Sequence, residues 1–115
     1  MKSQLITVEN QGITYQALKF VCPGCKAMEP GDSTGLHILP VNSNPTTPSW
    51  DWNGDTEKVT LTPSILTRSY RGNCHSFLRE GIFEFLSDSE HSLAGQNVPM
   101  TDLEVWMVKE QLDGK

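Results

Sequence analysis

The sequence predicts a β-rich fold with a minor α component: short antiparallel strands followed by short helical segments after residue 87. One observation supports this fold class, and a second supports a single domain. Nine glycines and seven prolines divide the chain into short apolar runs, which leaves few stretches that could form a long helix. The 115 residues contain no internal repeat and no linker, so we expect residues 1–115 to form one domain around one modest core.

The first part of the chain contains a series of apolar runs bounded by turn residues, which is typical of strands. The predicted strands are residues 5–8, 13–21 and 36–41, with an alternating run at 50–52 and a strand region at 58–61 and 65–66. Gly12 marks a turn between the first two strands, and Asn53-Gly54 is a strong turn signal. Pro63 breaks the last strand region because proline cannot donate a backbone hydrogen bond.

Residues 74–86 predict a hairpin whose two-residue loop is Glu80-Gly81. The opposed pairs in that register are Leu78 with Phe83 and Ser76 with Phe85. Because side chains alternate along a strand, Cys74 shares the inward side of these pairs, whereas His75 points to the other side.

Beyond the hairpin, two segments fit the capping-box pattern of a helix start. Residues 87–90 (SDSE) predict one or two helical turns over 88–94, with Gly95 where the helix would end. Residues 101–104 (TDLE) predict a C-terminal helix from about residue 102. The apolar residues that follow suit a strand equally well, so both alternatives stay open.

The charge balance argues against nucleic-acid binding, because 9 Lys and Arg face 14 Asp and Glu, for a net charge of −5. The sequence lacks an apolar run long enough for a membrane helix, and its first residues do not resemble a secretion signal. We therefore expect a cytoplasmic protein.

The spacing Cys22-Pro-Gly-Cys25 is the most specific local pattern, because two cysteines across a tight turn can direct both sulfurs at one tetrahedral Zn²⁺ ion. Cys74 is the only other sulfur ligand of this kind, and a histidine would complete a Cys3His site. His91 is the first choice and His37 the alternative, since His75 points away from Cys74. The fold class therefore includes a zinc knuckle.

Two other interpretations of the same cysteines stay open. They can be buried thiols at a turn, or they can form a redox pair. A redox Cys-x-x-Cys normally begins a helix, and Pro30 and Gly31 follow too closely here to favour one.

A second set of residues could carry hydrolytic chemistry. Ser64 follows the Pro63 break, where a side chain can be held rigidly, and His75 on an outward strand face could serve as its general base. Asp88, at i, i+3 from His91, could orient an imidazole. The alternative is that Ser64 satisfies backbone groups at a bend, since no G-x-S-x-G motif surrounds it. Trp50 and Trp52 are expected to be core and rim aromatics.

The ordered motifs across residues 18–100 resemble an uncharacterised phage and prophage domain family, some of whose members are labelled "ammonia monooxygenase". The motifs are Cys22-Pro-Gly-Cys25, His37-Ile-Leu-Pro40-Val, Trp52-Asn-Gly54, Pro63-Ser-Ile-Leu66, Cys74-His-Ser-Phe77 and Phe85-Leu-Ser-Asp88-x-x-His91-x-Leu-Ala-Gly-Gln96. No copper or di-iron ligand pattern supports that label. Members often have Asp-Cys-x-His where this chain has Asp88-Ser89-Glu90-His91, so a cysteine there is not needed for a metal site in this chain.

More remote relatives lie in bacterial ubiquitin-like conjugation operons, which implies a peptidase or protein-handling role. Their Pro-Ser-Ile segment and Ser-His pair match Ser64 and Cys74-His75 here, and their additional cysteines resemble metal ligands. The resemblance therefore assigns the cysteines to metal and Ser64 and His75 to chemistry.

Two main functions and one lesser option follow from these observations. The first is a zinc-stabilised phage or prophage accessory protein in the host bacterium that binds or processes a host protein. The alternative is a serine-type hydrolase or peptidase with Ser64 as nucleophile, His75 as base and Asp88 or His91 assisting. A metal-dependent hydrolase is a third option, which requires a coordination position open to water. The distance from Ser64 Oγ to a histidine nitrogen distinguishes the first two.

Overall fold

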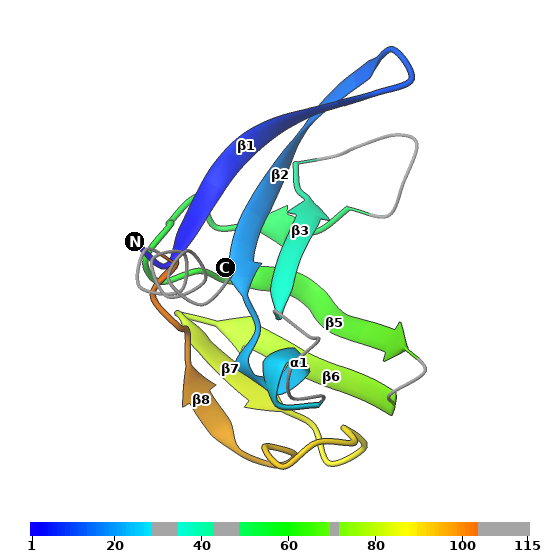
Figure 1. Cartoon of the computed structure of the whole chain (residues 1–115). Helices are drawn as coiled ribbons and strands as arrows, with labels where there is room; N and C mark the ends of the chain where they lie inside the picture. Colours follow the sequence, from blue (N-terminus) through cyan, green and yellow to red (C-terminus); the bar gives the residue numbers. More distant parts are fainter. Residues whose placement is uncertain (29–34, 43–48, 70–71, 104–115) are drawn as a thin grey trace, which may run out of the picture.

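Two antiparallel sheets share one hydrophobic core in the computed structural model of the chain, which describes residues 1–28, 35–42, 49–69 and 72–103 (Figure 1). The elements are β1 (Ser3–Asn10), β2 (Ile13–Val21), α1 (Pro23–Met28), β3 (Leu36–Pro40), β4 (Asp51–Trp52), β5 (Leu61–Ser69), β6 (Gly72–Arg79), β7 (Ile82–Phe85) and β8 (Asn97–Pro99). This β-rich architecture confirms the predicted fold class. None of the helices in the described ranges has the length and apolar character needed to cross a membrane.

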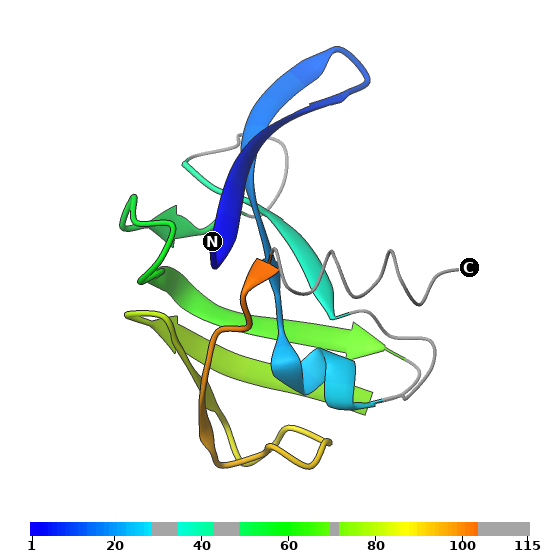
Figure 2. The ribbon, with the colours of Figure 1, turned by 60° about the vertical axis from the view of Figure 1, so that its left-hand side comes forward.

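The first sheet has the order β1-β2-β3, and its β1–β2 hairpin extends well away from the second sheet in both views (Figures 1 and 2). Gln11 and Gly12 connect the two strands, with φ angles of 51° and 82°. A two-residue loop with both φ angles positive matches the right-handed twist of the strands that it joins. The predicted hairpin is therefore confirmed, with β1 beginning at Ser3 instead of Leu5.

The second sheet has the order β4-β5-β6-β7-β8, and the β6–β7 hairpin has the predicted register. Leu78 pairs with Phe83 and Ser76 pairs with Phe85, around a loop of Glu80 and Gly81. The inward side chains of β6 at positions 74, 76 and 78 are buried, while those at 73, 75 and 77 are partly exposed. The prediction that Cys74 and His75 face opposite ways is confirmed.

Strand β5 differs from the prediction, because it is one strand from Leu61 to Ser69 and residues 58–60 lie outside it. Its pairing with β6 shifts register between Leu61 and Ile65. Pro63 cannot donate a ladder hydrogen bond, and a register shift leaves that position out of the ladder without ending the strand. Ser64 lies within this irregular stretch.

The helical turns predicted over residues 88–94 are not formed, because this segment consists of turns. The Glu90 side chain, which a capping box would direct to the backbone N–H of Ser87, accepts from the backbone N–H of Asn73 in β6 instead, and the Ser89 hydroxyl binds the His75 backbone. Tertiary partners therefore replaced the local ones that the capping box would need. The predicted C-terminal helix lies almost entirely in residues 104–115, which are outside the described ranges.

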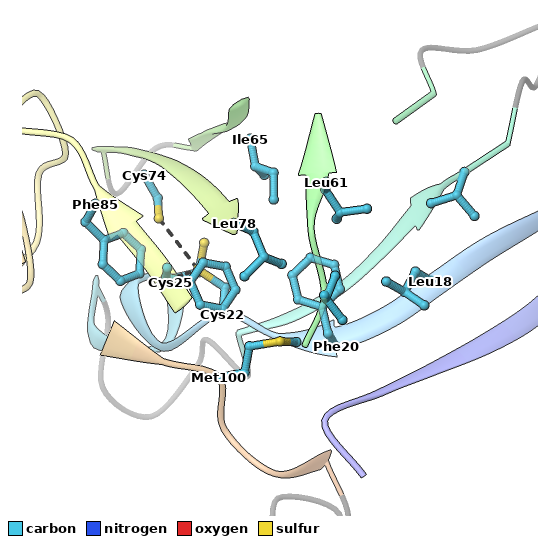
Figure 3. Close-up of a cluster of buried hydrophobic side chains, with 13 residues drawn as sticks. Leu18, Phe20, Cys22, Cys25, Leu61, Ile65, Cys74, Leu78, Phe85 and Met100 are labelled. Carbon is cyan, nitrogen blue, oxygen red and sulfur yellow. Dashed lines mark hydrogen bonds between the residues drawn. The ribbon is translucent and has the colours of Figure 1, made fainter. Parts of the chain in front are cut away.

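The core lies between the inner faces of the two sheets (Figure 3). Its buried members from the two sheets include Leu18, Phe20, Leu61, Ile65, Leu78, Phe83 and Phe85. The side chains of all three cysteines join the same cluster, and Figure 3 shows them gathered at one end of it. The core and the sulfur ligands are thus parts of one packed interior.

The register of β5 and β6 can be tested by comparing an inward leucine of β6 with an outward leucine of β5. We expect Leu78→Ala to lower the free energy of unfolding by about 2–5 kcal/mol, because it leaves a cavity in the core. Leu66→Ala, at a side chain that is 41% exposed, should change it by about 0.5 kcal/mol or less. Urea unfolding followed by circular dichroism measures both, and equal losses would contradict the register.

Candidate active site and metal centre

Three polar side chains, from β5, β6 and the turn after β7, form a hydrogen-bonded row. Ser64 Oγ lies 3.1 Å from His75 Nε2. On the other side of the ring, His75 Nδ1 lies 3.1 Å from Asp88 Oδ2 and 3.3 Å from Asp88 Oδ1. The structure therefore brings together the three residues that the sequence suggested for hydrolytic chemistry.

The strand register explains how Ser64 and His75 meet. Leu66 pairs directly with His75 on neighbouring strands, so both side chains lie on the outer face of the sheet. Ser64 is two positions before Leu66 in β5 and therefore shares that face. Asp88 reaches the same ring from the turn that follows β7.

The partners of the imidazole fix the direction of each hydrogen bond. An ionised carboxylate can only accept, so Nδ1 of His75 carries the proton and donates it to Asp88. Nε2 of the neutral ring is then an acceptor for the Ser64 hydroxyl. A serine hydroxyl that donates to an oriented imidazole is the arrangement that general-base activation of a nucleophile requires.

Two residues that were not assigned to this site on sequence grounds contact its members. The indole Nε1–H of Trp50 donates to the Ser64 carbonyl oxygen at 3.3 Å. Trp50 was expected only as a core or rim aromatic, so this contact with the site is an additional role. The Ser89 hydroxyl accepts a hydrogen bond from His75 N and donates one to His75 O. The capping-box pattern of residues 87–90 pointed to a helix start, so no local signal identified Ser89.

The second group of interest is the sulfur cluster at the end of the core. Cys22 Sγ and Cys74 Sγ are 3.8 Å apart, and Cys25 Sγ is 3.2 Å from His37 Nε2. The ligand atoms of Cys22, Cys25 and His37 all lie within 4.8 Å of one another, which is geometrically suited to holding a metal ion. His91 Nε2 lies 3.3 Å from Cys74 Sγ.

The turn between the first two cysteines begins a short helix, which corrects the expectation that Pro30 and Gly31 disfavour one. Pro23 occupies the first position of α1, where its missing N–H costs nothing and its φ angle suits a helix. The backbone N–H of Cys25 donates to Cys22 Sγ at 3.4 Å. Both views place α1 against β6, the strand that carries Cys74 (Figures 1 and 2).

A backbone contact of His91 decides what this ring can do. The Leu93 N–H donates to His91 Nδ1 at 3.2 Å, so Nδ1 is an acceptor and the neutral ring carries its proton on Nε2. Burial lowers the pKa of His91, which favours this neutral form. The Nε2–H group then donates to the Cys74 sulfur. Because Nε2 of His91 carries this proton, it has no lone pair with which to bind a metal.

Gly24 permits this close approach. A Cβ atom at Gly24 would lie 2.5 Å from a Phe85 ring carbon and 2.6 Å from His91 Nε2, which is closer than real Cβ contacts. The glycine between the two cysteines therefore admits the ring that donates to Cys74.

The three thiols do not ionise independently. A hydrogen bond to the Cys25 sulfur and burial raise the pKa of Cys22 to about 12. Hydrogen bonds with Cys22 and Cys25 together with burial also raise the pKa of Cys74, while hydrogen bonds from Cys22 and Cys74 lower that of Cys25. Several thiolates this close together would need a cation beside them, which is the charge that a metal ion at Cys22, Cys25 and His37 would supply.

The comparisons with known proteins give one family. The model of the family BubE, described as "Bacterial ubiquitination-like system serine protease", matches residues 1–86. That range contains Ser64, His75, all three cysteines and His37, and it ends just before Asp88. No curated protein and no solved structure matches the chain.

Proposed function

Since the chain belongs to the BubE family of serine proteases of bacterial ubiquitination-like systems, we propose that it is a serine protease with Ser64 as its nucleophile. The observation that carries this proposal is the continuous row Ser64–His75–Asp88, with both hydrogen bonds near 3.1 Å. His75 is the general base, and Asp88 holds its ring in the tautomer that the base requires.

The proposed reaction passes through an acyl-enzyme. Ser64 Oγ attacks the carbonyl carbon of the scissile bond while its proton moves to His75 Nε2. The imidazolium, stabilised by Asp88, then gives this proton to the leaving group as the bond to that group breaks. A water molecule, deprotonated by the same Nε2, attacks the acyl carbon and releases the acid and the free serine.

The substrate class that we propose is a ubiquitin-like protein or its conjugate, because the family description places these proteases in ubiquitination-like systems. On sequence grounds, an accessory protein that binds or processes a host protein comes first, and the distance between Ser64 and His75 is the feature that distinguishes it from a hydrolase. Their side chains are 3.1 Å apart, which favours the hydrolase. The phage or prophage origin stays a prediction.

We propose further that the sulfur cluster holds one zinc ion through Cys22, Cys25, Cys74 and His37. The tautomer of His91 supports His37, the alternative of the sequence analysis, over His91 as the fourth ligand. Four protein ligands close a tetrahedral site, so the ion would link α1, β3 and β6 and leave no position for water. Its role is then structural, and the metal-dependent hydrolase loses its support.

The nucleophile can be tested by covalent labelling. We expect a fluorophosphonate probe to label Ser64, and Ser64→Ala to abolish labelling without a change in melting temperature. His75→Gln should slow labelling by about 10²–10⁴-fold, the usual contribution of a general base. Mass spectrometry of the labelled peptide identifies the site, and Ser87→Ala is the matched control in an exposed turn. Labelling that persists in Ser64→Ala would contradict the proposal.

The two histidines near the sulfur cluster should differ in metal binding. We expect one zinc per chain in the wild type, with His37→Ala losing the metal because a ligand is removed. His91→Ala should keep one zinc at saturation, with an affinity lower by about 10–100-fold, as for loss of a hydrogen bond to a ligand. Competition with a chromophoric chelator and elemental analysis measure both. The reverse pattern would make His91 the ligand.

Removal of the metal should unfold the domain instead of only inactivating it. The binding free energy of a structural zinc is largely folding free energy, on the order of 10 kcal/mol in small zinc peptides. A chelator should therefore lower the melting temperature sharply, and added zinc should restore it. An unchanged melt after elemental analysis has verified zinc loss would show that the core is sufficient alone.

A further inference from the structure

Residues 88–91 contact strand β6 on both of its faces and along its edge. The contacts are Asp88 with the His75 ring, Ser89 with the His75 backbone, Glu90 with the Asn73 backbone and His91 with the Cys74 sulfur. Four consecutive residues thus bind three consecutive residues of β6. The outer-face contact belongs to the candidate active site, and the inner-face contact belongs to the sulfur cluster.

Ser89 attaches the segment to the backbone of His75. Its side chain is buried, with 7% of the residue exposed. The hydroxyl accepts from His75 N at 3.0 Å and donates to His75 O at 2.9 Å, so its single donor is used. The backbone N–H of Leu86 donates to the same carbonyl at 2.9 Å. The residue after Asp88 is therefore fixed to the backbone of the histidine that Asp88 orients.

The Asp88 carboxylate needs such support because few neighbouring atoms restrict its position. Its side chain is 65% exposed, while that of His75 is 22% exposed. A hydrogen bond from an imidazole to an exposed carboxylate, like an exposed ion pair, is weak and does not by itself fix the carboxylate's position. The distance between Asp88 and Nδ1 then depends on where the backbone places the carboxylate.

The far end of the segment is attached to the edge of the strand by Glu90 and to its inner face by His91. Glu90 forms a reciprocal pair with Asn73: Glu90 N donates to Asn73 O at 2.8 Å, and Asn73 N donates to Glu90 Oε1 at 2.8 Å. One residue later, His91 Nε2–H donates to Cys74 Sγ. The segment that carries Asp88 is therefore tied to the sulfur cluster as well as to His75.

We propose that Ser89 is a positioning residue of the active site, and that residues 88–91 form a clasp through which the sulfur cluster keeps Asp88 on His75. This inference rests on the proposed function for the role of Asp88, and it adds the means by which an exposed carboxylate is held in place. Ser89 acts through Asp88 and does not itself touch the reacting atoms.

A double-mutant cycle tests this proposal. We expect Ser89→Ala to slow fluorophosphonate labelling of Ser64 by about tenfold, as for the loss of one to two net hydrogen bonds. If Ser89 acts through Asp88, then Ser89→Ala combined with Asp88→Asn should label no more slowly than Asp88→Asn alone. Multiplied losses, or an unchanged rate in a folded Ser89→Ala protein, would overturn it. Ser87→Ala in the same turn is the matched control.

A second readout does not depend on labelling. The His75 Nδ1 proton, assigned in NMR spectra by its loss in Asp88→Asn, should also be lost or broadened in Ser89→Ala and weakened in His91→Ala. If the wild type does not label but these changes occur, the protease proposal fails and the clasp stands. If the signal persists in both variants, the clasp is wrong whatever the labelling shows. His91→Ala decides the matter should Ser89→Ala not fold.

Discussion

The alternation of side chains along β6 is the constraint on which both sites depend. Cys74 points into the core and His75 points to the outer face, although they are neighbours in sequence. A shift of one residue in the pairing of β6 would exchange these directions and dismantle the sulfur cluster and the Ser64–His75 contact together. The hydrophobic pairing of Leu78 with Phe83 fixes that register, so core packing also sets the geometry of both sites.

The sulfur cluster occupies one end of the core, a position that aliphatic side chains fill in most protein interiors. Cys22, Cys25 and Cys74 are all buried and belong to the main hydrophobic cluster. They connect β6 with the segment that runs from β2 into α1, which the sheet hydrogen bonds do not link directly. A small domain gains much from such a connection because its apolar burial alone is modest.

The candidate active site combines a rigid and a less rigid part. Ser64 and His75 lie on paired strands of one sheet, so their separation is set by the ladder and by the register shift near Pro63. Asp88 lies in a turn, and its position depends on contacts made by the residues that follow it. Membership of a serine protease family agrees with this row of three residues, and the family match itself ends at residue 86. The assignment of Asp88 therefore rests on the hydrogen bond to His75.

The sequence by itself determined those strands whose loops and alternating apolar residues lie within a short stretch of the chain. Gln11-Gly12 and Glu80-Gly81 specify two-residue loops, and the apolar positions on either side of the second loop specify its register, which separated Cys74 from His75. The spacing of Cys22 and Cys25 likewise indicated that their sulfurs meet. The tertiary structure decided the rest. Glu90 of the capping-box pattern binds β6 instead of starting a helix, and Pro63 lies in a register shift instead of ending β5. The Leu93 N–H, placed by the folded turn, sets the His91 tautomer. For the capping box, a local preference worth about 1 kcal/mol competed with backbone groups of β6 that are distant in sequence, and those partners prevailed.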